Sequence, residues 1–268
     1  MSEKFTRTDL PPKTGVADFT RVIADLLFPV IEGGGGRLMH GSKLRVRLTA
    51  LLKPLKARLS DSPERLAEKF FTDLREIKNK LKEDAVFIAS NDPAATEVDE
   101  VIMTYPGFYA ILVYRVANCL AGYNVPLIPR VMTEYAHSQT GIDIHPKASV
   151  DSPFFIDHGT GIVIGETAVI GKRVKLYQGV TIGALSVGKS MAFTKRHPTI
   201  ENDVIIYAGS TILGGETVIG HDSIIGGNVW LTESVSPYSL VYHENKVSVR
   251  KRADNGPNTN IKIINYEI

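Results

Sequence analysis

The stretch FIDHGTGIVIGETAVIG, residues 155–171, decides the fold. Around it, aliphatic residues return at every sixth position and shift once by two, at Ile144, Val150, Ile156, Ile162, Ile164, Ile170, Leu176 and Ile182. A helix needs apolar steps of three and four, and a two-faced strand needs continuous alternation. A step of six therefore predicts very short strands that are joined by regular turns.

The same period returns further along the chain. It runs through Ile200, Ile206 and Ile212, slips by one, and continues at Leu213, Ile219, Ile225 and Leu231. Such spacing is typical of a hexapeptide β-helix, in which each hexapeptide forms one face of a triangular prism. Residues 142–235, without their interruption, predict about four to five coils, enough to bury a continuous core.

The interruption is ALSVGKSMAFTKR, residues 184–196. It is polar, basic and rich in small residues, so we expect it to project from the prism as a loop. Inserted loops on repeat scaffolds are commonly binding elements.

The first half of the chain predicts helices instead. Apolar stripes at helical spacing cover about residues 16–30, 44–55 and 66–81, and two further candidates lie at about 106–122 and 126–139. Ser62-Pro63-Glu64 is a plausible helix start, because proline is tolerated in the first turn. The segment NDPAA at 91–95 is predicted to be a loop or a helix entry.

Composition narrows the possible classes of protein. The 268 residues, 43% hydrophobic and 22% charged, can bury a substantial core. No stretch approaches the roughly 18 apolar residues of a membrane span, and the first residues lack a secretory apolar core, so we expect a cytoplasmic protein without membrane contact. A net charge of +2 does not suggest a nucleic-acid partner. The single cysteine, Cys119, is favoured as a buried structural thiol.

His158 interrupts the aliphatic pattern, and two kinds of chemistry are open for it. A zinc site would need three converging imidazoles, and the histidine pair five residues apart that β-helical carbonic anhydrases carry is absent, so no metal is expected. General-base catalysis needs a carboxylate to orient the imidazole. Asp143 lies 15 residues earlier, close to one coil of about 18 residues, so the two could stand near each other. By spacing alone, His158 could equally be a solvated turn residue.

Seven segments in family order carry a specific resemblance. They are NDPA at 91–94, YPGFYAILVYRVAN at 105–118, GIDIHPKASV at 141–150, the stretch at 155–171, GVTIG at 179–183, RHPTI at 196–200 and YAGSTILGG at 207–215. Together they resemble the serine O-acetyltransferase family of cysteine biosynthesis. The resemblance implies an α+β fold, with a helical domain followed by a left-handed parallel β-helix of hexapeptide repeats. It further implies transfer of an acetyl group from acetyl-CoA to the hydroxyl of L-serine.

The resemblance also assigns roles to residues. It makes His158 the general base and Asp143 its orienting partner, and it places Asp92 and Asp157 where the substrate is held. Carboxylates there would naturally pair with the serine ammonium. Without the resemblance, Asp92 and Asp157 are ordinary turn residues, because Asp favours such turns.

Further assignments concern the serine carboxylate and acetyl-CoA. Arg196 matches the carboxylate clamp, a task suited to a planar guanidinium, and His197 matches a second active-site histidine. Backbone around Gly183 and Ala208 matches acetyl-CoA contacts. The implied reaction is a direct attack in a ternary complex, without an acyl-enzyme and without a metal. By themselves, Arg196 and His197 could be a solvated loop end.

The expected organisation has three parts. Residues 1–140 form an α-helical oligomerisation domain, residues 141–240 form the acyltransferase β-helix with the loop at 184–196, and residues 241–268 form a tail. The resemblance implies a homotrimer or a dimer of trimers with active sites between subunits. It also implies that a terminal Ile268 binds O-acetylserine sulfhydrylase. The segment VYHENKVSVRKR at 241–252 departs from the family's usual Gly-x-Pro-Ala closure.

Two other functions stay open at this point. An acetyltransferase of the same fold could act on another small alcohol, such as homoserine or a sugar. A catalytically idle β-helix could instead serve as a trimeric scaffold. The set of Asp92, Asp157 and Arg196 argues for an amino-acid substrate, whereas the scaffold predicts that His158→Ala equals wild type in every assay.

Overall fold

The computed structural model describes residues 10–29, 31, 41–185 and 194–244. Its first half contains α1 (Lys13–Leu27), α2 (Gly41–Leu52), the 3-10 helix η2 (Lys53–Arg58), α3 (Pro63–Asn91), α4 (Val98–Thr104), α5 (Pro106–Gly122) and α6 (Ile128–Thr140). The second half contains β1 (Asp143–Ile144), β2 (Ser149–Val150), β3 (Phe154–Ile156), β4 (Val163–Ile164), β5 (Val169–Ile170), β6 (Val174–Leu176), β7 (Thr181–Gly183), β8 (Thr199–Ile200), β9 (Ile205–Ile206), β10 (Thr211–Leu213), β11 (Val218–Ile219), β12 (Ile224–Ile225), β13 (Trp230–Leu231) and β14 (Leu240–Val241).

The helices follow the predicted stripes, with two differences. Ser62 caps α3 as expected, because its hydroxyl accepts the backbone N–H of Arg65 at 3.2 Å. α3 continues beyond the predicted stripe to Asn91, since Ala85 and Ile88 extend its buried face. α4 was not predicted from the sequence, and its short length gives little periodicity to detect.

The strands form three parallel sheets that wrap around one axis. The first sheet has the order β1-β4-β7-β10-β13, the second β11-β8-β5-β2 and the third β14-β12-β9-β6-β3. Successive strands along the chain belong to different sheets, so each of the first four coils contributes one strand to each face, and the last coil contributes β13 and β14 only. The fold is the predicted left-handed parallel β-helix behind a helical region. Its coils place the predicted aliphatic residues inside, as Ile164, Ile182 and Ile212 are at most 1% exposed.

The shift by two positions in the aliphatic pattern is an insertion in one turn. Ile156 pairs with Leu176 and Ile164 pairs with Ile182, so the coils are in register on both sides of the turn. Seven residues, 157–163, join the first pair of positions, whereas five, 177–181, join the second. The turn after β3 therefore holds two additional residues.

Most coils turn from the third to the first sheet through a stack of glycines. Gly161, Gly179 and Gly209 have φ values of 83°, 73° and 73°, in the left-handed region that glycine adopts without cost. A Cβ at Gly179 would lie 3.4 Å from the backbone of Gly209. The positive φ is therefore the reason for glycine at this corner, since a Cβ at Gly161 or Gly179 would make only ordinary van der Waals contact.

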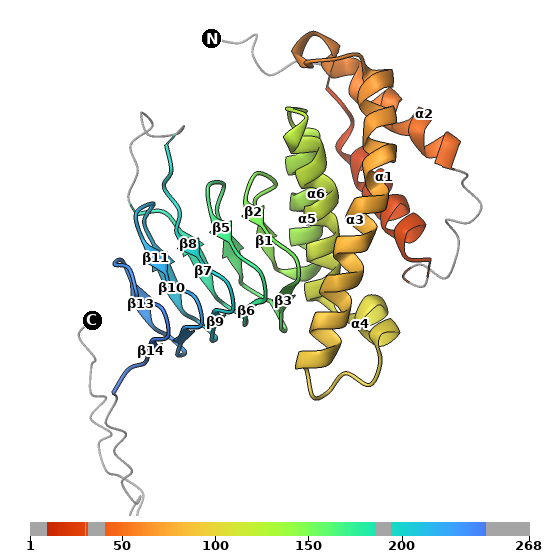
Figure 1. Ribbon diagram of the computed structural model, residues 1–268. Helices are drawn as coiled ribbons and strands as arrows, with labels where there is room; N and C mark the ends of the chain where they lie inside the picture. The colour runs from red at the N-terminus through yellow and green to blue at the C-terminus, as the bar shows by residue number, and fades with distance from the viewer. Residues whose placement is uncertain (1–9, 30, 32–40, 186–193, 245–268) are drawn as a thin grey trace, which may run out of the picture.

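The helical region packs against the first coil of the prism. Figure 1 shows α3, α5 and α6 beside the coil of β1, β2 and β3, with β13 and β14 at the far end of the solenoid. The approach is closest at Gly107, near the start of α5, where a Cβ would lie 2.3 Å from the carbonyl oxygen of Ile156. This contact fixes the start of α5 against the end of β3.

A buried ion pair locks the same junction. Arg115 of α5 donates two hydrogen bonds to Asp84 of α3, at 2.6 and 2.8 Å, and both side chains are at most 5% exposed. The guanidinium also donates to the carbonyl oxygens of Val150 and Asp151, and Asp84 accepts the N–H of Phe154. Two helices and the turn between β2 and β3 are thereby held by one polar network.

The predicted loop at 184–196 lies between β7 and β8, and its residues 186–193 are outside the described part of the chain. β14 pairs with β12 and ends at Val241, one residue past the expected boundary at 240. Among the described residues, no helix is long and apolar enough to cross a membrane.

We expect Asp84→Asn to destabilise the fold by about 3–5 kcal/mol, because it leaves the Arg115 charge buried without its partner. Urea unfolding followed by circular dichroism measures the change. The matched control is Asp203→Asn, which breaks the exposed ion pair with Arg173 and should lose little stability, because solvent screens that pair. Equal losses in the two variants would contradict the proposed importance of the buried junction.

Candidate active site

His158 occupies the two-residue insertion between β3 and β4. Its φ is 54° and that of the following Gly159 is 81°, so the backbone turns through the left-handed region twice in succession. The turn carries the His158 side chain out of the prism, where it is 74% exposed. An imidazole in this position can exchange a proton with a bound molecule.

Two carboxylates lie beside His158. The nearer one is Asp157, whose Oδ1 is 3.6 Å from His158 Nδ1, an electrostatic contact that is too long for a hydrogen bond. The other is Asp92, at the C-terminal end of α3, and the charge of His158 contributes to lowering the pKa of this carboxyl group. Segments 65 residues apart in the chain thus meet because α3 packs against β3.

Asp92 is held by neutral donors. Its Oδ2 accepts the hydroxyl of Tyr105 at 2.6 Å, and its Oδ1 accepts the backbone N–H of Ala94 at 2.8 Å. These two hydrogen bonds, that from Tyr105 first, hold the pKa of Asp92 below its usual value. In the part of the chain that the structure describes, neither Asp92 nor Asp157 pairs with a lysine or an arginine. The site therefore carries negative charge that a ligand cation can neutralise.

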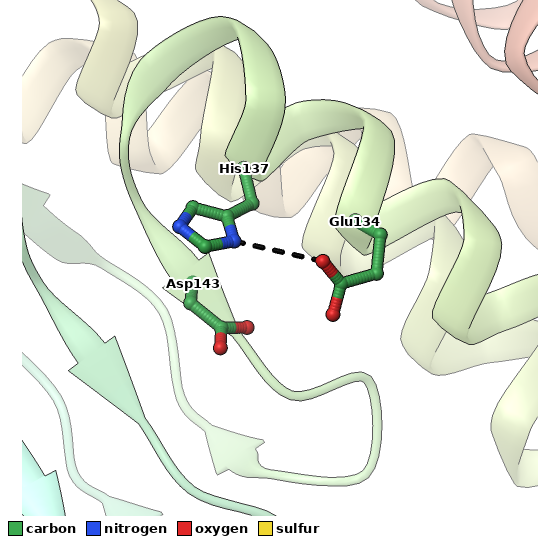
Figure 2. Close-up of side chains that lie close together, drawn as sticks. All are labelled: Glu134, His137 and Asp143. Carbon is green, nitrogen blue, oxygen red and sulfur yellow. Dashed lines mark ion pairs between the residues drawn. The ribbon is translucent and has the colours of Figure 1, made fainter.

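Asp143 is not in contact with His158 in this structure. Its Oδ1 accepts a hydrogen bond from Arg130 of α6 at 3.2 Å, and its carboxylate lies beside Glu134 and His137 of the same helix (Figure 2). The expected pair of Asp143 and His158 is thus not formed in the single chain, because Arg130 holds the carboxylate. Asp157 is the carboxylate that lies next to His158.

The cluster around Asp143 has the residue types of a metal site. One ligand atom from each of Glu134, His137 and Asp143 lies within 4.8 Å of the other two. Figure 2 shows the three side chains close together. However, Arg130 forms ion pairs with both Glu134 and Asp143. A metal ion would have to displace this guanidinium, so the cluster fits an ion-pair network better than a metal centre.

His197 is buried at the opposite end of the first sheet's strands. Its ring lies on Gly165, where a Cβ would come within 2.0 Å of the imidazole. Its Nδ1 lies 3.1 Å from the backbone nitrogen of Thr167 and 2.8 Å from the Thr167 hydroxyl. That hydroxyl also accepts the backbone N–H groups of Arg196 and His197, so its own proton points to Nδ1. The imidazole is therefore an acceptor at Nδ1 and a donor at Nε2.

The surroundings keep His197 neutral. Burial lowers the pKa of its imidazole to about 4, and the charges of Arg196 and Lys195 act in the same direction. Lys195 lies close because its ammonium donates to the backbone carbonyl of Thr167 at 2.9 Å. Among the described residues no hydrogen bond of Nε2 is found, so the neutral His197 can donate its Nε2–H to a negatively charged oxygen.

Arg196 is oriented by Glu166. Burial alone would raise the pKa of the Glu166 carboxyl group, but hydrogen bonds from Arg196 and Lys147 lower it to about 2. The carboxylate is therefore always ionised near neutral pH, and the ion pair holds the Arg196 side chain close to His197. Glu166 and Thr167, in the second coil, thus hold Arg196 and His197 in place.

The predicted site residues fall into two groups, one where the strands of the first sheet begin and one where they end. We call Asp92, Asp157 and His158 the acidic edge, because they lie before the strands of this sheet begin. We call Lys195, Arg196 and His197 the basic edge, because they pack beside Gly165, where β4 has ended. The chain does not bring His158 and His197 together, because they lie at opposite ends of the strands of the first sheet.

The predicted acetyl-CoA contacts divide in the same way. Gly183 is the last residue of β7 and lies on the side of the basic edge. Ala208 lies in the turn after β9, on the side of the acidic edge, where its carbonyl oxygen accepts the N–H of Asn228. Each edge therefore holds one of the two predicted backbone contacts.

Three residues that shape the site were not predicted. Tyr105, Glu166 and Thr167 hold Asp92, Arg196 and His197, respectively. All three lie inside segments that carried the resemblance, at 105–118 and 155–171. No spacing rule singles them out, because each acts on a residue that is distant in the sequence.

The chain is similar in sequence to several curated serine acetyltransferases. No family model matches it. A serine acetyltransferase of Synechococcus elongatus, plasmid-encoded by its name, is 49% identical over 188 residues, which is 68% of this chain and 59% of the relative. The serine acetyltransferase of Bacillus subtilis is 42% identical over 161 residues, 60% of this chain and 72% of the relative. The matches span 59–64% of the length of this Synechococcus protein and of two further curated serine acetyltransferases, so the chain spans only part of these relatives.

Solved structures agree with these relatives. Serine acetyltransferase isoform 3 of Entamoeba histolytica, in complex with cysteine, has a TM-score of 0.73 and 34% identity, covering 88% of this chain and 84% of that one. A serine acetyltransferase in complex with CoA has a TM-score of 0.59 and 26% identity, with coverage of 86% and 98%. The chain belongs to the serine acetyltransferase family.

Proposed function

We propose that the protein transfers the acetyl group of acetyl-CoA to the hydroxyl of L-serine, giving O-acetyl-L-serine and CoA. The observation that carries this proposal is the acidic edge, where the exposed His158 stands beside two carboxylates without a lysine or arginine partner among the described residues. Such a site attracts an ammonium group and offers a base to a nearby hydroxyl. The solved relative with bound CoA supports acetyl-CoA as the donor.

In the proposed reaction, His158 removes the proton from the serine hydroxyl. The oxygen attacks the thioester carbonyl, a carbon–oxygen bond forms, and the carbon–sulfur bond breaks. The CoA thiolate leaves and takes the proton back from His158. The Nε2–H of His197 stabilises the negative oxygen of the tetrahedral intermediate.

No protein nucleophile is required in this scheme. Burial raises the pKa of the Cys119 thiol to about 11, and its sulfur lies 3.2 Å from the Tyr123 hydroxyl. A thiol with this pKa is almost entirely protonated near neutral pH and is a poor nucleophile. Direct transfer in a ternary complex is therefore favoured over an acyl-enzyme.

Substrate recognition divides between the two edges. Asp92 and Asp157 pair with the serine ammonium, and Arg196 binds the serine carboxylate. Backbone near Gly183 and Ala208 contacts acetyl-CoA. Asp143 joins the proposal as the orienting partner of His158, since catalytic hydrogen bonds often form only when substrate is bound.

A second subunit completes the proposed site. The acidic edge and the basic edge lie on opposite sides of the first sheet, so the acidic edge of one chain would face the basic edge of its neighbour. A homotrimer, alone or paired into a dimer of trimers, provides this arrangement. The outward residues Val163 and Val169, 40% and 39% exposed, offer apolar surface for such contacts.

A protein partner is the last part of the proposal. Binding of O-acetylserine sulfhydrylase through Ile268 is supported by the family resemblance. The segment 245–268 lies outside the described residues.

We expect wild-type protein to release thiol from acetyl-CoA only when L-serine is present. His158→Ala should lower kcat by about 100-fold or more, because it removes the general base. A thiol-reactive dye measures the rate. The control is His221→Ala, which removes another histidine beside an aspartate, Asp222 at 2.8 Å, in the turn between β11 and β12. Full activity in His158→Ala would refute the role of this residue.

A mixing experiment tests the shared site. Purified His158→Ala and His197→Ala proteins should each be inactive, but oligomers assembled from an equal mixture should regain about a quarter of wild-type activity, since each site draws one edge from either chain at random. A mixture of His158→Ala and Asp92→Ala should regain nothing, because both changes affect the acidic edge. Recovery in the second mixture but not the first would overturn the arrangement.

The acid side of the pH profile should not belong to His197. A pKa of about 4 leaves His197 neutral throughout pH 5–8, so protonation of His197 begins only below this range. His197→Asn should therefore lower kcat without moving the pH at which kcat/KM for serine falls by half. A shift of that midpoint would show that His197 titrates in the working range.

A further inference from the structure

Tyr105 connects the helical region to the acidic edge. It is the residue between α4 and α5, and Pro106 directly follows it as the first residue of α5. Its half-buried side chain donates a hydrogen bond to Asp92 Oδ2 at 2.6 Å. This is a short hydrogen bond to a charged acceptor, which is a stronger class of contact than one between neutral groups.

With the hydrogen bond from Tyr105, each oxygen of the Asp92 carboxylate accepts one hydrogen bond. One oxygen accepts the backbone N–H of Ala94, and the other accepts the hydroxyl of Tyr105. Each carboxylate oxygen has two lone pairs, so one lone pair on each oxygen stays available for a ligand. The two donors therefore fix the plane of the carboxylate and leave it able to bind a cation.

Packing fixes the position of Tyr105 relative to both carboxylates. Gly107, two residues later, lies against the carbonyl of Ile156, and Ile156 directly precedes Asp157. The hydrogen bond to Asp92 raises the pKa of the Tyr105 hydroxyl to about 12, and the charge of Asp157 contributes in the same direction. The hydroxyl therefore stays protonated near neutral pH and can donate to Asp92.

We infer that Tyr105 is a positioning residue of the ammonium subsite: its hydroxyl holds the Asp92 carboxylate in the orientation that pairs with the amino group of the substrate. The inference rests on the proposed function, because it assumes an amino-acid substrate. It goes further by naming a residue that touches Asp92 and not the reacting atoms. Tyr105 thus contributes to the choice of substrates that carry an ammonium group.

The test is Tyr105→Phe, which keeps the ring and removes only the hydroxyl. We expect the KM for serine to rise about tenfold, equivalent to about 1.4 kcal/mol, which is near the lower end of the range for a hydrogen bond to a charged group. The kcat should change by less than about threefold and the KM for acetyl-CoA should not change, because the lost contact concerns substrate binding only. A merely structural role would affect both substrates and kcat together.

A matched control is available within the helical region. Tyr123 of the turn after α5 donates its hydroxyl to Asp73 of α3, far along that helix from Asp92. Tyr123→Phe removes the same kind of hydrogen bond and should leave the KM for serine unchanged. A tenfold rise in both variants would show a general effect of loosening α3 and would overturn the inference.

Coupling to Asp92 gives a second readout. In the Asp92→Asn background, Tyr105→Phe should raise the serine dissociation constant, measured by calorimetry, by less than about threefold, because no carboxylate remains to be oriented. An undiminished tenfold effect would overturn the inference. Carbon-13 NMR of the Asp92 carboxyl should show its pKa rising in Tyr105→Phe and not in Tyr123→Phe.

These measurements separate the two proposals. If wild-type protein binds serine but releases no thiol with it, the catalytic proposal fails while the binding and NMR results still decide the role of Tyr105. If wild-type protein does not bind serine, the inference fails with the proposal of serine as substrate. If serine binds and Tyr105→Phe changes neither its affinity nor the Asp92 titration, only the inference is overturned.

Discussion

Register between successive coils is the constraint on which the rest of this structure depends. Every inward aliphatic residue must meet its counterparts one coil above and one coil below, as Ile164 does with Ile144 and Ile182. The strands are only two or three residues long, so an additional residue cannot be absorbed inside them. Any insertion is forced into a turn and points outward. The two additional residues after β3 follow this rule, and they put His158 on the surface of the prism.

The packing of the helices against the first coil places a second carboxylate beside the exposed His158. The first coil is clamped to α3 and α5 by the buried pair of Asp84 and Arg115 and by the close approach at Gly107. Both contacts place the C-terminal end of α3 beside the end of β3. Asp92 and Asp157 consequently lie together, although the repeat pattern contains only one of them. Burial and hydrogen bonding at this junction therefore shape the proposed site as well as the fold.

The acidic edge and the basic edge of the first sheet differ in charge and in the groups that hold their charged residues. On the acidic edge, the Asp92 carboxylate is held by neutral donors and keeps its charge for a ligand. On the basic edge, Arg196 is held by a carboxylate and His197 is kept neutral by burial and by neighbouring cations. One edge is thus suited to an ammonium group, and the other to a carboxylate and a developing oxyanion. The sheet that separates the edges is the physical reason for proposing a site shared between subunits.

The sequence alone was sufficient for the solenoid, because a six-residue period has one simple structural solution, and for most helices, because their apolar stripes are long. It also located His158 as an interruption of the repeat. It could not find α4, which is too short for a period, or the contact of Asp143 with Arg130, which depends on how α6 packs on the first coil. The sequence did not predict the roles of Tyr105, Glu166 and Thr167 for a related reason. Each holds its partner across 13 to 30 positions of the chain, so only the tertiary structure, which brings α3, α5 and successive coils together, decided what surrounds the predicted site.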